Sequence, residues 1–201
     1  APNWPQTLHI KNEKSSIVLP PDVFHFTFAG NVGKVQDLEN VILGFHEASI
    51  DNAHLNIIGD GSHLEYLKQF IASKQITNVI FHGHIPLNEI NDVLEQINVL
   101  LISLMPDPVM ELTVPLKFQT YLLSSKPIYA VMPGEVRRLV TEYHLGKVAQ
   151  PLNIDEISAE FKNFIINPVD QAEVKAQSEY LLKHVYNREK IIGDLTSIFF
   201  S

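Results

Sequence analysis

Short apolar runs alternate along the chain with segments in which apolar residues return at helical spacing. Several of these runs are apolar at consecutive positions, which is typical of strands buried on both faces in a parallel sheet. We expect six strands, over residues 23–29, 55–58, 79–81, 99–104, 128–132 and 147–148.

The segments between the runs carry the pattern of amphipathic helices. The first has an apolar stripe at the i, i+3, i+4, i+7 spacing of one helix face, formed by Leu38, Val41, Ile42 and Phe45. Because strand and helix alternate without interruption, the pattern predicts an α/β fold with right-handed crossovers. The expected architecture is a Rossmann-like doubly wound parallel sheet, which binds ligands at the carboxyl ends of its strands. Beyond Pro151 only helices are expected, over residues 154–166, 171–184 and 188–199.

Prolines and polar residues set the start of the sequence apart from the rest. Pro2, Pro5 and the polar stretch 11–16 follow no helical or strand period, so residues 1–21 are expected to form a linker. Residues 22–201 form one expected domain, which includes the C-terminal helices from about residue 154. A chain of 201 residues that is 45% hydrophobic can bury one sizeable core.

Charge and residue content exclude several classes of function. A formal net charge of −8 argues against a nucleic-acid partner, because such proteins neutralise phosphates with clustered lysines and arginines. The chain has no cysteine, which excludes a disulfide, a thiolate metal site and a cysteine nucleophile. No apolar run approaches the roughly 20 residues that span a bilayer, so we expect no transmembrane segment in this chain.

Glycines follow the first two expected strands. A phosphate-binding turn, in which backbone N–H groups approach the anion, is one interpretation of the first set; a tight turn that needs glycine explains it equally well. The residues of this set are Gly30, Asn31, Gly33 and Lys34. After the second strand, residues 59–61 read Gly-Asp-Gly, but Leu64 stands where a dinucleotide fingerprint has its third glycine. We interpret that segment as an ordinary turn.

Two histidines flank a glycine at the end of the third strand. Strand alternation would put the imidazoles of His82 and His84 on one face, where a metal pair is conceivable. No carboxylate or third histidine lies nearby in the sequence, so we expect no metal ion. We expect instead that main-chain groups around Gly83, followed by Ile85, meet the edge of a base.

The densest cluster of candidate residues follows the fourth strand. Pro115 suits the first turn of a helix, which leaves the N–H groups of Leu116 and Lys117 free to bind an anion. Lys117 adds a positive charge, while Gln119 and Thr120 carry neutral groups that can bond hydroxyls. A solvated lysine on an amphipathic helix is the alternative. We favour the binding site, because the segment lies beside the other strand-end loops.

Together these segments resemble the C-terminal, donor-binding domain of retaining, family 4-like glycosyltransferases of the GT-B fold, which build bacterial polysaccharides and lipopolysaccharides. The resemblance covers nearly the whole chain and includes the strand ends at Gly30, Gly59 and Gly83. Its most specific part is residues 115–122, Pro-Leu-Lys-Phe-Gln-Thr-Tyr-Leu, followed by Lys-Pro-Ile at 126–128. This block is similar to the Pro-Ser-Lys, Tyr-Leu and Gly-Lys-Pro block of lipopolysaccharide and capsule transferases.

The chain also departs from the family. The family carries two glutamates separated by seven residues, one near the sugar and one on the ribose, and the matching positions here are Leu112 and Thr120. Glu111 and Gln119 have the same separation one residue earlier. The candidate catalytic residues are Lys117 and Glu111. The candidate donor-binding residues are Gly30, Asn31, Gly33, Lys34, His82, Gly83, His84, Ile85, Leu112, Thr113, Val114, Leu116, Gln119 and Thr120.

The resemblance implies sugar transfer from a nucleotide diphosphate sugar, expected to be linked to uridine, to a glycan or lipid-linked acceptor without a metal or other cofactor. An N-terminal acceptor-binding domain is expected to be missing, which would leave this domain alone inactive; residues 2–4 resemble the end of the family's inter-domain linker. The expected location is cytoplasmic, with association at the inner face of the cell membrane left open.

Three alternatives remain at this point. One is a catalytically inactive nucleotide-sugar-binding or regulatory module, which the missing glutamates support. A second is a UDP-sugar epimerase of the same fold. A third is a nicotinamide-dependent oxidoreductase, against which the missing third glycine at Leu64 argues.

Overall fold

A computed structural model describes residues 14–111 and 113–186, with the side chains of residues 109 and 110 excepted. Within this part, six parallel strands form one sheet in the order β3-β2-β1-β4-β5-β6. The strands are β1 Phe24–Ala29, β2 Ala53–Ile58, β3 Val79–Gly83, β4 Val99–Ser103, β5 Ile128–Val131 and β6 Gly146–Ala149. The predicted Rossmann-like doubly wound sheet is confirmed, and each predicted strand is present with ends shifted by at most two residues.

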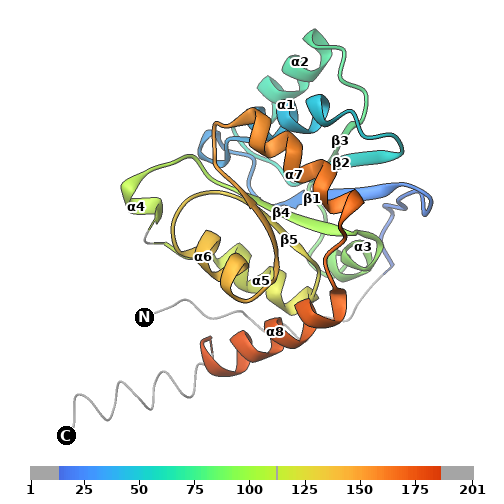
Figure 1. The fold of residues 1–201 in the computed structure, drawn as a ribbon. Coiled ribbons are helices and arrows are strands. Elements are labelled where there is room, and N and C mark those ends of the chain that lie inside the picture. The colour runs from blue at the N-terminus through green and yellow to red at the C-terminus, as the bar shows by residue number, and fades with distance from the viewer. Residues whose placement is uncertain (1–13, 112, 187–201) are drawn as a thin grey trace, which may run out of the picture.

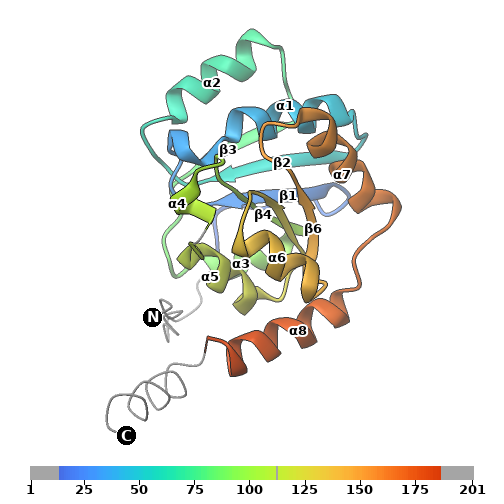
Figure 2. The same cartoon turned by 60° about the vertical axis from the view of Figure 1, so that its left-hand side comes forward.

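Helices cover both faces of the sheet (Figures 1 and 2). One layer contains α1 Leu38–Ala48, α2 Leu64–Ser73 and α7 Ile154–Ile166. The other contains α3 Ile90–Gln96, α5 Leu116–Ser124 and α6 Glu135–Glu142, with α8 Gln171–His184 packed outside α5. The short helices η1 Lys34–Gln36 and α4 Pro108–Glu111 lie in strand-end loops. The predicted bounds of α7 and α8 are confirmed, whereas the helix expected over 188–199 lies outside the described residues.

Each layer has its own apolar core. Phe26 on β1 lies among aromatic rings of α1 and α7, with ring centroids 5.9 Å from Phe45 and 4.8 Å from Phe161. On the other face, Phe118 and Leu122 of α5 pack into a buried cluster with residues of β4, β5 and α6. The i, i+4 spacing of this pair explains why α5 forms here, since both side chains lie on its sheet-facing side.

The end of the expected linker is docked on α3. Residues 14–21 contain no helix or strand, and three of their backbone N–H groups donate to side chains of the 89–96 segment: Ser15 to Asp92, Ser16 to Glu89 and Leu19 to Gln96. Residues 1–13, which hold the rest of the expected linker, lie outside the described residues. Among the helices of the described ranges, none is both long and apolar enough to span a bilayer.

Candidate functional site

The order of the strands creates a crevice between β1 and β4. The chain leaves β1 for one layer of helices and leaves β4 for the other, so the loops at their carboxyl ends diverge. Such a topological switch point is where open α/β sheets bind ligands. A pocket of about 490 Å³ lies here, bounded by the ends of β1 and β2, the β3–α3 loop, α3 and α5. Its lining residues are Ala29, Gly30, Asn31, Ile58, Gly59, Asp60, His84, Ile85, Leu87, Ile90, Leu94, Lys117, Thr120 and Tyr121.

Lys117 places a positive charge in this pocket. Its Nζ lies 3.5 Å from the centroid of the Phe28 ring, in a cation–π contact. The side chain is half-buried, and desolvation lowers the pKa of Lys117 to about 7. Among the described residues, no carboxylate forms an ion pair with it. The ammonium form of Lys117 therefore has no counter-anion in the described part of the chain, and a phosphate would supply one.

Glycines bring the backbone close to Lys117. Gly30 has φ 142°, and a Cβ at this position would lie 2.7 Å from Lys117 Cε. Gly59, with φ 130°, packs closely against Gly30: a Cβ at position 59 would lie 1.9 Å from the Gly30 carbonyl oxygen. The Gly30 N–H donates to Ile58 O, and the Gly59 N–H donates to Gly83 O. Gly59 and Asp60 thus line the pocket, a role that our interpretation of residues 59–61 as an ordinary turn did not assign to them.

Backbone donors at the pocket differ from those expected. The Gly33 N–H donates to Gln36 Oε1 at 2.9 Å and is occupied. Neither Gly33 nor Lys34 lines the pocket. Helix α5 begins at Leu116 with Pro115 as its extended N-cap, so the prediction of Pro115 inside the first turn was wrong by one residue. The N–H groups of Leu116 and Lys117 have no acceptor within the described residues, as expected at a helix start.

His82, in β3, and His84, which follows the strand, lie in different surroundings. The pairing of β2 with β3 shifts register between Ile57 and Ile58, so the alternation that would put both imidazoles on one face is broken. His82 Nε2 is 2.9 Å from the buried Asn56 Oδ1, and burial lowers the pKa of His82. His84 and Ile85 line the pocket. Across the described residues, no group of three or more His, Asp or Glu side chains is placed to hold a metal ion.

Of the two neutral candidates on α5, Gln119 and Thr120, one lines the pocket. Thr120 lines it, and its Oγ1 donates to Leu116 O at 3.2 Å. Gln119 is fully buried, and neither of its amide atoms has a partner in the described part of the chain. Thr120 is therefore part of the pocket lining in this fold, and Gln119 is not.

The pocket collects six of the sequence-predicted residues: Gly30, Asn31, His84, Ile85, Lys117 and Thr120. Others lie outside its lining, namely Gly33, Lys34, His82, Gly83, Glu111, Thr113, Val114, Leu116 and Gln119. Leu112 lies outside the described residues. Glu111 is exposed, and its backbone packs against Gly134. The sequence did not reveal Tyr121, whose spacing from Lys117 places both on one helix face, or the apolar wall of Leu87, Ile90 and Leu94.

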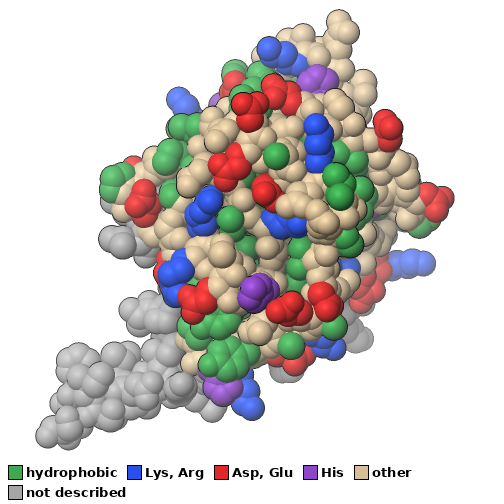
Figure 3. All heavy atoms as spheres, in the orientation of Figure 1, with side chains coloured by type: hydrophobic (Ala, Val, Ile, Leu, Met, Phe, Trp, Pro, Cys, Tyr) green, Lys and Arg blue, Asp and Glu red, His purple; other side chains and the backbone are tan. Residues whose placement is uncertain are grey.

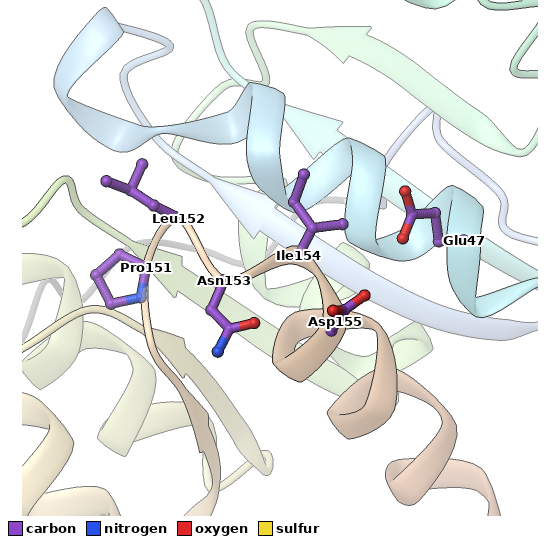
Figure 4. A pocket seen from close by; sticks show the side chains of 6 residues that line it. All are labelled: Glu47, Pro151, Leu152, Asn153, Ile154 and Asp155. Carbon is purple, nitrogen blue, oxygen red and sulfur yellow. The ribbon is translucent and has the colours of Figure 1, made fainter.

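A second hollow, of about 540 Å³, lies between α1 and the β6–α7 loop (Figure 4). Its charged lining side chains are Glu47 and Asp155, and it has no lysine or arginine in its lining. Both carboxylates would repel a phosphate. On the face shown in Figure 3, acidic and basic side chains are interspersed, without the continuous basic patch of a nucleic-acid interface. The crevice at the switch point is therefore the candidate site.

Comparison with known proteins gives consistent matches. The family described as "Glycosyl transferases group 1" matches residues 9–180. A curated relative, the probable glycosyltransferase WbjE of Pseudomonas aeruginosa, is 32% identical over 123 residues. That match covers 60% of this chain, and the chain spans only 30% of the relative.

Solved structures share the fold at low sequence identity. Staphylococcus aureus TarM, crystallised with UDP and other ligands, superposes with TM-score 0.72 at 14% identity, over 95% of this chain and 38% of TarM. The C-terminal domain of the group 1 glycosyltransferase LpcC from Francisella tularensis gives TM-score 0.63 at 13% identity, over 82% of this chain and 87% of that domain. The described fold thus corresponds to nearly all of one isolated C-terminal domain.

Proposed function

Because the chain belongs to the group 1 glycosyltransferases, we propose that it holds a uridine diphosphate sugar as the donor for transfer to a glycan or lipid-linked acceptor. The observation that carries the proposal is Lys117, an unpaired lysine held beside Gly30 in the switch-point crevice. TarM, which has the same fold, was crystallised with UDP.

Different lining residues of the pocket suit the base, the ribose and the diphosphate of such a donor. The base would lie by His84 and Ile85 against the apolar wall, where main-chain groups can read its edge. The diphosphate would lie at Lys117 and Asn31, within reach of the N–H groups at the start of α5. Thr120 is placed for a ribose hydroxyl between them.

Lys117 would carry the chemical step. As the bond between the sugar and the diphosphate breaks, negative charge grows on the departing diphosphate, and a preorganised cation stabilises it. The same charge raises the pKa of Lys117 back toward its ordinary value, so the lysine would be an ammonium when the diphosphate leaves. No step requires a metal ion. Glu111, exposed at the end of α4, would orient the sugar from outside the pocket lining.

We propose that an N-terminal domain binds the acceptor, since the chain matches an isolated C-terminal domain and spans only a third or less of its curated relative. On this proposal the chain alone binds donor but transfers no sugar, and the whole enzyme works in the cytoplasm on polysaccharide precursors.

Titration calorimetry tests the donor site. Wild-type protein is expected to bind UDP with micromolar Kd and to show no NAD binding. Lys117→Ala should raise the Kd for UDP roughly 10- to 100-fold, since a hydrogen bond to a charged group contributes about 1.5–3 kcal/mol. Lys126→Ala is the matched control, because Lys126 is also half-buried on the α5 side but donates to Glu95 O away from the pocket. Tight NAD binding, or equal losses in both variants, would overturn the proposal.

A donor-binding module without transferase activity is the second candidate. Thr120 lines the pocket where the family has a ribose-binding glutamate, and Leu112 replaces the other glutamate. UDP binding with no sugar transfer by the full-length protein, across lipid-linked acceptors, would favour this candidate over the enzyme.

A further inference from the structure

The β1–β4 ladder ends abruptly at the switch point. The two strands pair up to Phe28 and Leu101 and then separate. In a parallel ladder continued by one pair, the Ala29 N–H would donate to the Leu101 carbonyl. The end of this ladder matters for the site, because Ala29 is followed directly by Gly30 on the pocket floor.

The Tyr121 hydroxyl stands where that ladder bond would be. It accepts from the Ala29 N–H at 3.1 Å and lies 3.2 Å from the carbonyl oxygens of both Leu101 and Ala29, to which its proton can be donated. A phenol has one proton and two lone pairs, so this single group can serve backbone atoms of both strands. Tyr121 is 3% exposed, so its hydroxyl makes these contacts in a buried place rather than in bulk water.

The same side chain fixes helix α5. Tyr121 lies one helical turn after Lys117, and both residues line the pocket. A hydroxyl bonded to β1 and β4 therefore sets the depth at which α5 carries Lys117 over Phe28 and Gly30.

We propose that Tyr121 is a positioning residue: its hydroxyl holds β1 and β4 apart at the switch point and fixes the Ala29–Gly30 turn and Lys117 for the donor diphosphate. This inference rests on the proposed function. It assigns Tyr121 to the phosphate end of the site, and it distinguishes Tyr121 from a buried tyrosine that contributes to stability alone.

The chain offers a matched control for that distinction. Tyr129 on β5 is fully buried, and its hydroxyl donates to Ile157 O at 2.8 Å on the opposite face of the sheet. Phenylalanine at either position removes one buried hydroxyl and leaves backbone groups without their partner. Only Tyr121 adjoins the pocket.

The experiment compares Tyr121→Phe with Tyr129→Phe in the full protein. Thermal unfolding measures stability, calorimetry measures UDP binding, and ligand-observed NMR measures binding of uridine, which has the base and ribose but no phosphates. Both variants should lower Tm, each by roughly 2–8 °C. Tyr121→Phe should raise the Kd for UDP about tenfold and leave uridine binding within about twofold of wild type. Tyr129→Phe should leave both affinities unchanged.

Three results would overturn the assignment: unchanged UDP affinity in Tyr121→Phe, equal loss of UDP affinity in both variants, or equal loss of uridine and UDP affinity in Tyr121→Phe. Failure of the wild-type protein to bind UDP would be a different result. It would overturn the proposed function, and the role of Tyr121 with it.

Discussion

The charge of Lys117 is expected to make donor binding depend on pH near neutrality. Burial lowers its pKa from 10.5 to about 7, so about half of the unliganded molecules carry a neutral lysine at pH 7. A diphosphate in the pocket favours the ammonium form, because an opposite charge within a few ångströms stabilises it. Binding of UDP should therefore take up a proton.

The magnitude follows from the protonated fraction. If the ammonium form is the one that binds, the apparent Kd is the intrinsic Kd divided by that fraction. The fraction falls from about one half at pH 7 to about one hundredth at pH 9. UDP affinity of the wild-type protein is then expected to fall roughly 50-fold over this range. Below pH 6 Lys117 is almost fully protonated and contributes no further change.

Calorimetry between pH 6 and 9 measures this dependence directly. Titrations at pH 8 in buffers of different ionisation enthalpy give the number of protons taken up, which should be roughly 0.9 per UDP bound. Lys117→Ala should bind weakly, with no pH dependence between 7 and 9. A wild-type Kd that stays constant from pH 7 to 9, or a slope that persists in Lys117→Ala, would refute the assignment of the titrating cation.

Three other substitutions test the pocket floor at Gly59, the buried amine of Lys117 and the apolar core at Phe161. Gly59→Ala should raise the Kd for UDP at least about tenfold, because its Cβ would meet the Gly30 carbonyl oxygen; Gly146→Ala, whose Cβ would come equally close to a carbonyl oxygen of β5, should leave the Kd unchanged. Lys117→Met should stabilise the fold by on the order of 2–4 kcal/mol at pH 7, after allowance for partial exposure. Because the pKa of Lys117 is lower in the folded than in the unfolded state, the wild type loses stability as pH falls from about 10.5 to 7. Urea unfolding at pH 10.5 should therefore show no stability gain of Lys117→Met over wild type. Phe161→Ala should cost about 3–5 kcal/mol in urea unfolding while UDP binding persists in the folded protein.

The sheet could be predicted because its strands are buried on both faces. Runs such as β4, with four consecutive apolar residues before Ser103 and every residue buried, leave few alternatives to a central parallel strand. The position of α5 after β4 also indicated a site on this helix, and Lys117 and Thr120 do line the pocket. Residues 59–61 were interpreted as an ordinary turn, because the close approach of Gly59 to Gly30 is a contact between two strand ends that are distant along the chain.

Three parts of the site depended on tertiary structure. The shift between His82 and His84 comes from an irregularity in β2–β3 pairing, which alternation within a single strand cannot reveal. The choice between Gln119 and Thr120 depended on the rotation of α5, which the packing of Phe118 and Leu122 fixes. Tyr121 was part of the matching block but was given no role at the site, because a tyrosine on an apolar helix face has the same pattern as any core residue.

On the proposed function, an acidic chain has to hold a polyanion. A net charge of −8 gives no long-range attraction for a diphosphate, and exposed charges more than about 10 Å away are screened at moderate salt. Attraction must come from groups that act at short range in a desolvated place, where each charge interacts more strongly than in water. Lys117 meets this requirement because Phe28, Gly30 and Tyr121 surround it with a ring, bare backbone and a neutral phenol. A glutamate at position 120 would lie in the same pocket wall and compete with the phosphate for that cation. With threonine there instead, no carboxylate at position 120 competes with the proposed diphosphate for the ammonium form of Lys117.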